Sequence, residues 1–255
     1  MNETLVVNEV YLSLQGESTF AGLPCIFVRL TACNLRCSYC DTAYAFTEGR
    51  RMAVADVHAE VRRLAAGMDA GGRARVVAMP GADGGHRLPL VEFTGGEPLL
   101  QPRAVALMAS LCDDAFTVLV ETSGAHDIGV LDPRVRRIMD LKCPSSGEDG
   151  RNRWANVPLL RATDEVKFVV GTWEDYAWMK AVLEREALAS RCPVLVSWVA
   201  PLTDAQRDPS LKRVPSGHRP LSRRELADQI IADGLPVRFQ LQMHKFVWPV
   251  DARGV

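Results

Sequence analysis

The chain has 255 residues, of which 47% are hydrophobic and 24% are charged, an ordinary composition for a globular protein. Thirty lysines and arginines against 31 aspartates and glutamates leave a net charge of −1, which excludes a global positive field that would steer the chain to nucleic acid. The sequence contains no apolar run of about 18 residues and no signal-peptide pattern at its start. Seven cysteines, three of them crowded together, favour a reducing compartment. We therefore expect a cytoplasmic protein that binds neither membrane nor nucleic acid.

The first predicted strand, Val6 to Leu14, alternates apolar and polar residues and ends in a polar turn, in which glycine normally marks only a tight bend. The next apolar run, Pro24 to Thr31, is rich in β-branched and aromatic residues, which is typical of a buried parallel strand. Arg29 interrupts this run, so its side chain either extends towards solvent or holds a carboxylate through two hydrogen bonds. Because α/β sheets bind ligands beyond the carboxyl ends of their strands, we expect this strand to deliver a functional loop.

Three cysteines follow with the spacing C-x3-C-x2-C, namely Cys33, Cys37 and Cys40. Deprotonated cysteines are soft ligands that select iron–sulfur clusters, zinc or cuprous ion. Three thiolates hold three irons of a [4Fe–4S] cube and leave the fourth iron open to a small molecule, whereas a structural zinc needs a fourth ligand, which does not follow at close spacing. The alternative of a buried cysteine stripe on a helix conflicts with the poor helix formers between the cysteines. The spacing therefore favours a cluster.

Val54 to Ala66 places apolar residues at a helical period, and we expect a helix there. The next stretch, at about 67–89, carries six glycines and two prolines and has no sustained periodicity. Structureless loops of this length are usually functional or disordered. We interpret it as a variable excursion, with a short strand at Arg75 to Ala78, inside one domain that spans residues 1–255.

A short strand that begins at Leu90 runs into two glycines, an acid and a proline, Gly95 to Pro98. Paired glycines let a backbone approach a ligand closely, so this loop is a candidate binding loop. Pro102 to Cys112 is a predicted helix with proline in its first turn. Two more apolar strands follow, and their polar exits begin at Glu121 and at Lys142.

The second half of the chain continues to alternate strands and helices. We expect strands at residues 165–170, 193–199 and 236–242, and helices at 174–189 and 222–233. The last helix has Ser222 at its N-cap and Glu225 at the capping-box position. Residues 206–220 are rich in basic side chains, but in a chain of near-zero net charge we interpret them as a solvated loop rather than a nucleic-acid contact. The last predicted strand runs into His244.

The cysteine motif, with an aromatic residue before its last cysteine, resembles that of the radical S-adenosylmethionine (SAM) enzymes. In that family the methionyl amine and carboxylate of SAM chelate the open iron of a [4Fe–4S] cluster. One electron from the cluster then cleaves SAM to methionine and a 5′-deoxyadenosyl radical, which takes a hydrogen atom from the substrate. The resemblance implies that Cys33, Cys37 and Cys40 are the cluster ligands and that Tyr39 packs beside the adenine.

Further strings, spread over nearly the whole chain, resemble one branch of these enzymes, the 7-carboxy-7-deazaguanine synthase family. They are Leu14-Gln15-Gly16-Glu17, Thr94-Gly95-Gly96-Glu97-Pro98, Glu121-Thr122-Ser123-Gly124 and Gln242-Met243-His244-Lys245-Phe246. The chain departs from the family in two places. Many members have Ser-Pro-Lys where this chain has Asp140-Leu141-Lys142, and this chain continues past Pro249, so no terminal carboxylate contact is carried over.

The resemblance also implies a set of site residues. For the substrate these are Leu14, Gln15, Gly16, Glu17, Arg29, Thr94 and His244, with Arg29 on the substrate carboxylate. For SAM they are Tyr39, Cys40, Asp41, Gly95, Gly96, Glu97, Thr122, Ser123, Asp140 and Lys142, with the glycine pair at the methionyl amine. The hydroxyl of Thr42 is implied as a ligand of Mg²⁺, a hard cation that prefers oxygen and that also takes oxygens from the substrate. No side chain is assigned as a general acid or base.

The implied fold is α/β, a partial (β/α) TIM-like barrel of the radical SAM type, with cluster and SAM at the carboxyl edge of its strands and residues at about 240–255 closing over the substrate. The implied reaction is the radical ring contraction of 6-carboxy-5,6,7,8-tetrahydropterin to 7-carboxy-7-deazaguanine with loss of ammonia, a step towards queuosine. A flavodoxin or ferredoxin as electron donor and a homodimer are further implications of the resemblance.

Two other functions stay open at this point. A radical SAM activase that generates a glycyl radical on a partner protein would bring further ferredoxin-like cysteine clusters, whereas Cys112, Cys143 and Cys192 are scattered along the chain. A zinc-stabilised nucleic-acid-binding module would need a fourth zinc ligand and a basic stripe, and neither is evident in the sequence.

Overall fold

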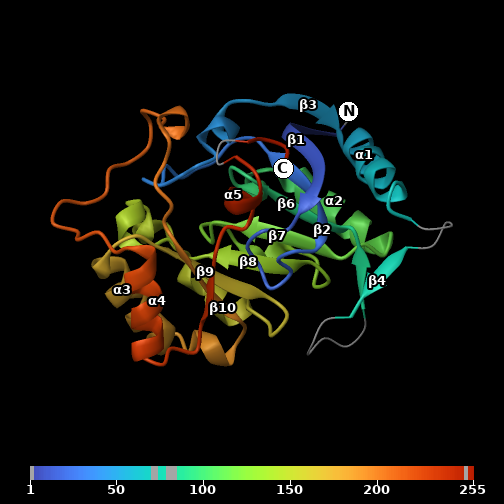
Figure 1. Cartoon of the computed structure of the whole chain (residues 1–255). Coiled ribbons are helices and arrows are strands. Elements are labelled where there is room, and N and C mark those ends of the chain that lie inside the picture. Colours follow the sequence, from blue (N-terminus) through green and yellow to red (C-terminus); the bar gives the residue numbers. More distant parts are fainter. Residues whose placement is uncertain (1–2, 70–73, 79–84, 250–251) are drawn as a thin grey trace.

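Figure 1 shows the computed structural model of the chain, which describes residues 3–69, 74–78, 85–249 and 252–255. The strands are β1 (Thr4–Leu14), β2 (Pro24–Leu30), β3 (Arg50–Ala53), β4 (Arg75–Val77), β5 (His86–Leu88), β6 (Leu90–Gly95), β7 (Val118–Thr122), β8 (Arg136–Asp140), β9 (Glu165–Val170), β10 (Val194–Trp198) and β11 (Arg238–Gln240). The helices are α1 (Val54–Ala66), α2 (Pro102–Asp113), α3 (Trp173–Arg185), α4 (Arg223–Ala232) and the short α5 (His244–Val247). None of the helices in the described ranges combines the length and apolarity that crossing a membrane requires.

The central sheet has nine strands in the order β11-β10-β9-β8-β7-β6-β2-β1-β3. Neighbouring strands from β11 to β2 are parallel, whereas β1 and β3 are added antiparallel. In the described part of the chain β11 and β3 do not pair with each other, so the sheet is open. Helices α1 and α2 pack against β1, and α3 packs against β9. The predicted fold class, a partial (β/α) barrel, is confirmed.

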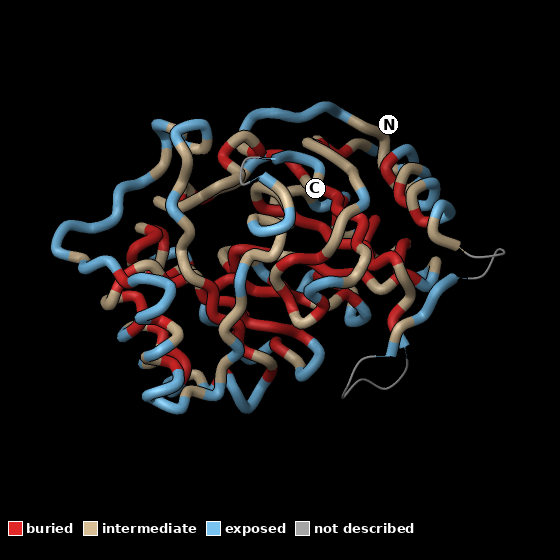
Figure 2. Tube along the Cα trace, in the orientation of Figure 1, coloured by how far each residue is buried: buried red, intermediate tan, exposed pale blue. Residues whose placement is uncertain are grey.

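Each parallel strand buries two faces, and its side chains alternate between them. In β6, Val91 and Phe93 join the large apolar core under the helices, so Glu92 and Thr94 point to the opposite, inner face of the sheet. A smaller apolar cluster fills the amino-terminal part of the inner face, and its members are Phe20, Cys25, Phe27, Leu90 and Leu119. Figure 2 shows the buried strands in the middle of the molecule. Polar inner residues therefore gather at the carboxyl end of the sheet.

Several predicted elements are confirmed with the predicted bounds. Helix α1 and strand β9 begin and end where the sequence pattern placed them. Ser222 and Glu225 form the predicted capping box of α4. In the stretch at about 67–89, the predicted strand is β4, which pairs antiparallel with β5. The remainder of that predicted excursion, at 70–73 and 79–84, lies outside the described residues.

Two predictions are wrong in extent, and two strands, β3 and β5, were not predicted. The helix expected at 174–189 ends at Arg185, because Ala187 adopts a left-handed conformation with φ of 48°. The last strand was expected at 236–242 and spans only Arg238–Gln240. Strand β3 extends the sheet beyond β1 and was not predicted, since its two exposed arginines read as loop.

Asp175 connects helix α3 to the loops beside it. It is fully buried, and its carboxylate accepts hydrogen bonds from the backbone N–H groups of Ser145 (2.7 Å), Gly171 (2.9 Å) and Thr172 (3.1 Å). The Thr172 hydroxyl in turn accepts from Asp175 N, which completes a capping box. Because one carboxylate satisfies three buried donors, it fixes the entry of α3 and the turn at Ser145 together.

We expect Asp175→Ala to lower the free energy of unfolding by at least about 3 kcal/mol, because three buried N–H groups lose their acceptor at about 1 kcal/mol or more each. Ser222→Ala, which removes an N-cap hydroxyl at the exposed start of α4, is the matched control and should cost only about 1 kcal/mol. Urea denaturation of both variants and the parent measures the difference. Equal, small losses in both variants would contradict the role given to Asp175.

Candidate active site

A cavity of about 520 Å³ opens at the carboxyl ends of the parallel strands, a size typical of small-molecule sites. Of the residues predicted to bind substrate, cluster, SAM or Mg²⁺, those that line it are Leu14, Gln15, Gly16, Glu17, Arg29, Cys33, Cys37, Tyr39, Cys40, Asp41, Thr42, Thr94, Gly95, Gly96, Thr122, Ser123, Asp140, Lys142 and His244. The fold thus brings together residues that are spread over more than two hundred positions of sequence. Glu97 is the exception and does not line the cavity.

The cysteine loop after β2 is irregular rather than helical, so the hypothesis of a cysteine stripe on a helix is wrong. All seven cysteines of the chain are free. The N–H of Leu35 points at Cys33 Sγ (3.4 Å), and Thr42 Oγ1 lies 3.8 Å from Cys40 Sγ. No three His, Cys, Asp or Glu side chains of the described residues converge as ligands of a single metal ion. A [4Fe–4S] cluster does not require such convergence on one ion, because each of its cysteines binds a different iron.

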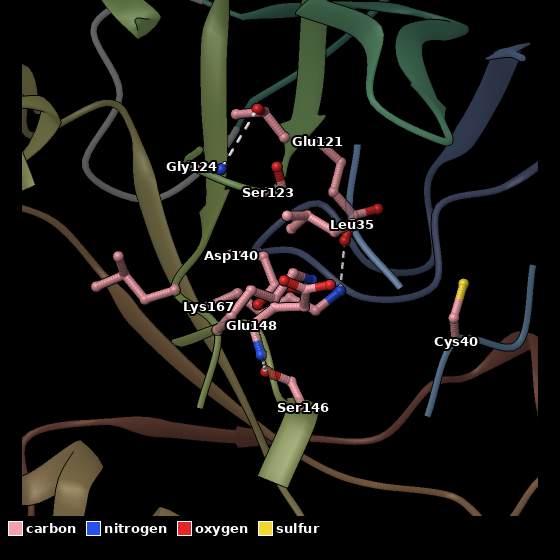
Figure 3. A network of polar contacts seen from close by, with 12 residues as sticks. Leu35, Cys40, Glu121, Ser123, Gly124, Asp140, Ser146, Glu148 and Lys167 are labelled. Atoms are coloured by element: carbon pink, nitrogen blue, oxygen red, sulfur yellow. Dashed lines mark hydrogen bonds and ion pairs between the residues drawn. The ribbon is translucent and has the colours of Figure 1, made fainter. Parts of the chain in front are cut away.

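The turn at residues 144–148 supports the cysteine loop from one side. Ser38 donates through its hydroxyl to Ser145 O (2.7 Å), and Arg36 N donates to Glu148 Oε1 (2.7 Å). Figure 3 shows Glu148 beside Ser146, whose hydroxyl accepts from Glu148 N (3.0 Å). The buried Glu148 carboxylate also pairs with Lys212 (2.9 Å). Lys212, from the basic loop at 206–220, therefore has a partner inside the protein. It pairs with the carboxylate that binds the cysteine loop.

The two glycines at the end of β6 are required by the backbone that they touch. A Cβ on Gly95, where φ is +127°, would lie 2.2 Å from Leu30 O, and a Cβ on Gly96 would lie 1.9 Å from Ala32 O. Gly96 N donates to Leu30 O, so the end of β6 is joined to the start of the cysteine loop. The sequence suggested that the glycines let a ligand approach the backbone. The structure shows that they let the backbone of the cysteine loop approach β6.

Glu97 is fully buried and holds two strand ends together. Its carboxylate accepts from Leu99 N (3.0 Å), from the Thr122 hydroxyl (2.8 Å), and from both N (2.8 Å) and Oγ (2.6 Å) of Ser123. Three of these four bonds join the end of β6 to the end of β7. Glu97 does not line the cavity, so its assignment as a supporting acid of the SAM site stays a prediction.

Beyond β8, Asp140 and Lys142 form an ion pair of 2.6 Å. Burial disfavours the charged form of Lys142, but Asp140 and Cys37 outweigh burial and raise the pKa of the lysine. Asp140 Oδ1 and the Tyr39 hydroxyl are buried in the cavity lining and have no hydrogen-bond partner among the described residues. Such atoms are rare in folded proteins, and a water molecule, an ion or a bound ligand commonly supplies the missing partner.

The N-terminal turn and the C-terminal segment meet on the opposite side of the cavity. Gln15 Oε1 accepts from Glu17 N (2.7 Å) and Ser18 N (3.0 Å), which shapes the turn. Met243 N donates to Gly16 O (3.1 Å), and a Cβ on Gly16 would lie 3.0 Å from His244 Nδ1. Glycine therefore allows a close approach where the two segments cross. His244 begins the short helix α5 rather than ending a strand.

Two further predicted residues have charged partners inside the protein. Arg29 donates to Glu9 Oε1 (2.7 Å) and to the Tyr11 hydroxyl (2.9 Å), so a carboxylate from β1 already engages part of its guanidinium. Asp41 pairs with Lys245 (2.6 Å), which outweighs the effect of burial and lowers the pKa of the carboxyl. The contact of Arg29 with the carboxylate of the substrate stays a prediction.

The sequence analysis missed two charged residues of the inner face, Glu92 and Lys167. Glu92 accepts from Gln15 Nε2 (2.9 Å), and burial together with Glu121 raises its pKa to about 8. Lys167 pairs with Glu17 (2.7 Å) and with Glu121. The signal that could have found them is the one noticed at Arg29, a charged residue that interrupts an apolar strand.

Some known proteins are similar to this chain in fold, and others are similar in sequence. QueE from Escherichia coli superposes with a TM-score of 0.64 at 19% identity, over 94% of this chain and 95% of that chain. SuiB from Streptococcus suis, solved with bound S-adenosylmethionine, superposes with a TM-score of 0.53 at 13% identity, over 83% of this chain and 48% of that chain. The 7-carboxy-7-deazaguanine synthase of Koribacter versatilis is 40% identical over 252 residues, which are 98% of this chain and 99% of the relative. No family model matches the chain.

An open, mostly parallel barrel that presents three cysteines at the carboxyl ends of its strands defines the radical SAM class of enzymes. Within this class the chain belongs to the 7-carboxy-7-deazaguanine synthase family, because the 40% identity extends over nearly the full length of both proteins. The family resemblance noticed in the sequence is thereby confirmed.

The radical SAM class implies a [4Fe–4S] cluster and SAM, and the described residues fit both groups. Cys33, Cys37 and Cys40 line the cavity and offer the soft thiolates that a cluster takes. The unpaired atoms of Asp140 and Tyr39 lie on the lining of the same cavity, where polar groups of SAM can satisfy them.

We expect Gly96→Ala to reduce cluster loading by about tenfold or more, because a Cβ 1.9 Å from Ala32 O forces the cysteine loop away from β6, a clash far beyond what a close-packed interior tolerates. Gly150→Ala is the matched control, since a Cβ there meets nothing within 4 Å. Iron content after anaerobic reconstitution measures the effect. Full iron content in Gly96→Ala would show that the close approach of the two loops is dispensable.

Proposed function

We propose that the protein converts 6-carboxy-5,6,7,8-tetrahydropterin to 7-carboxy-7-deazaguanine with loss of ammonia, in the biosynthesis of queuosine and related 7-deazapurines. The observation that carries this proposal is the 40% identity, over nearly the whole chain, to a protein of that name. The polar cavity at the carboxyl end of the barrel, which is lined by the cysteines, the N-terminal turn and part of the C-terminal segment, supports it.

Cys33, Cys37 and Cys40 are proposed to hold the cluster. When bound, the cluster and SAM together supply a radical that takes a hydrogen atom from the substrate. The chain's own contribution is to fix the cysteine loop, and the hydrogen bonds from Ser38 and Arg36 to the turn at 144–148 support this role. The Leu35 N–H aimed at Cys33 Sγ stabilises a thiolate there.

SAM is proposed to lie between the glycine loop and the end of β8. Its polar groups meet residues of the cavity lining, namely Tyr39, Cys40, Asp41, Gly95, Gly96, Thr122, Ser123, Asp140 and Lys142. Asp140 is suited to accept from a hydroxyl of the ligand, because Oδ2 holds Lys142 while Oδ1 is buried without a partner in the described chain. Glu97 keeps a positioning role, since three hydrogen bonds to its carboxylate hold Thr122 and Ser123 in place.

The substrate is proposed to lie between the N-terminal turn and the C-terminal segment. Leu14, Gln15, Gly16, Glu17, Arg29, Thr94 and His244 line this part of the cavity. Thr42 is proposed as a ligand of Mg²⁺, since its hydroxyl lies in the same cavity beside Cys40. Residues at about 240–255 are proposed to cover the substrate within a single domain. In support, Gln242, His244, Lys245 and residues 252–255 line the cavity.

The surroundings of the enzyme are also proposals. A flavodoxin or ferredoxin as electron donor and a homodimer are inferred from the family. The free thiols of all seven cysteines agree with a cytoplasmic location, because reducing conditions keep thiols unpaired.

Anaerobic reconstitution with iron and sulfide should give about four irons per chain and a reduced-cluster EPR signal that changes when SAM is added. The reconstituted protein should then convert 6-carboxy-5,6,7,8-tetrahydropterin. Alanine at Cys33, Cys37 or Cys40 should abolish both the signal and conversion, whereas Cys112→Ala, in the core at α2, should preserve both. One tightly held zinc and no SAM-sensitive signal would refute the proposal.

We expect Thr42→Val to raise the Mg²⁺ concentration for half-maximal activity by about tenfold or more, because the cation loses one protein oxygen. Thr47→Val changes an exposed threonine of the same loop and is the matched control. Steady-state rates at a series of Mg²⁺ concentrations, after removal of divalent ions with a chelator, measure the effect. Identical Mg²⁺ curves for the two variants would remove Thr42 from the metal site.

A further inference from the structure

Lys167 stands at the centre of a buried charge network that the proposal above does not use. Its side chain is only 6% exposed and lines the cavity. Nζ lies 2.7 Å from Glu17 Oε2 and also donates to Glu121, from the N-terminal turn and the end of β7. Figure 3 shows Lys167 and Glu121 among the polar residues of the site. One ammonium group on β9 thus holds two carboxylates of the cavity wall.

Each of the two carboxylates has a second contact that fixes its orientation. Gln242 Nε2 donates to Glu17 Oε1 (3.1 Å), and the Thr94 hydroxyl donates to Glu121 Oε2 (3.4 Å). A carboxylate offers about four acceptor sites. The contacts named here occupy two on each acid, so both acids are able to accept further hydrogen bonds from a molecule in the cavity.

A third acid of the inner face shows what burial does without such a partner. Glu92 makes no ion pair among the described residues, and burial and Glu121 raise its pKa to about 8. Burial also acts on Glu17, but Lys167 and His244 outweigh it and lower the pKa of Glu17 to about 2. Two acids of one cavity therefore differ in charge at neutral pH, and the position of Lys167 accounts for the difference.

We propose that Lys167 is a positioning residue for substrate recognition, which holds Glu17 and Glu121 in place as acceptors for the N–H edge of the substrate ring. This inference rests on the proposed function and adds a basis for its specificity. The 2-amino-4-oxo edge of a pterin carries adjacent N–H groups, which match the two oxygens of a carboxylate as a guanidinium does. A ring with oxygen in place of the 2-amino group loses one donor and should bind less tightly.

The test compares Lys167→Met with the parent in steady-state conversion of 6-carboxy-5,6,7,8-tetrahydropterin between pH 6 and pH 8. Without the ammonium, burial raises the pKa of Glu17, and the protonated acid accepts hydrogen bonds poorly. We expect KM to rise by about tenfold or more at the acidic end, as for a lost charged hydrogen bond, with a much smaller change in kcat. The ratio of the variant's KM to the parent's should fall as pH rises, because Glu17 then loses its proton.

The pH dependence has to be separated from other titrating groups. The groups that face Lys167 are Glu17, Glu92, Glu121, Asp140 and His244. Groups that titrate alike in both proteins, and the substrate itself, cancel in the KM ratio. Lys180→Met removes a half-exposed lysine of α3 and should leave the ratio at one, while Lys167→Arg, which keeps the charge, should restore KM towards the parent value.

A KM ratio that is the same at every pH would mean that Lys167 only supports the fold, and would overturn the inference while the proposed function stands. If the parent does not convert the pterin, the proposed function and this inference are both wrong. Where Lys167→Met does not load with iron, the double variant Glu17→Gln/Glu121→Gln and the triple variant that adds Lys167→Gln take its place. Equal KM values for these two support action through the two acids, and a further rise of about tenfold in the triple variant contradicts it.

Discussion

The site depends on the way each parallel strand buries two different faces. Side chains alternate along a strand, so β6 sends Val91 and Phe93 to the helices and Glu92 and Thr94 to the inside. Charges placed inside a barrel are costly unless they are paired. The inner face accordingly carries its charges as partners, among them Arg29 with Glu9, Asp140 with Lys142 and Lys167 with Glu17. The alternation that builds the core thus also builds the polar cavity.

The two sides of the cavity are built differently. On the cluster side, backbone meets backbone at Gly96 and Ala32, and the buried Glu97 joins adjacent strand ends, so this side is fixed by the sheet itself. On the substrate side, the turn at Gly16 meets the segment at Met243 and His244 through one backbone hydrogen bond and through the contact between Gln242 and Glu17. The same carboxyl edge therefore combines a rigid cofactor wall with a wall assembled from the ends of the chain.

Much of the fold and of the candidate site was predictable from local sequence patterns, and the features that depend on long-range contacts were not. Periodicity predicted α1 and β9, and nearly all the site residues implied by the family resemblance line the cavity. A string names a residue but does not say where its side chain points, so the string alone did not reveal that Glu97 joins two strand ends. Lys167 was missed because the apolar neighbours of β9 hid it, and its acidic partners became visible only when the sheet aligned β7, β9 and the N-terminal turn. Register and long-range pairing cannot be obtained from local patterns.

The crossing of Gly16 by the segment at Met243 and His244 has a consequence for how the enzyme is made. The turn at Gly16 is translated more than two hundred residues before His244. A nascent chain can therefore form β1, β2 and the cysteine loop while this contact is still missing. The substrate wall is complete only once translation has passed His244.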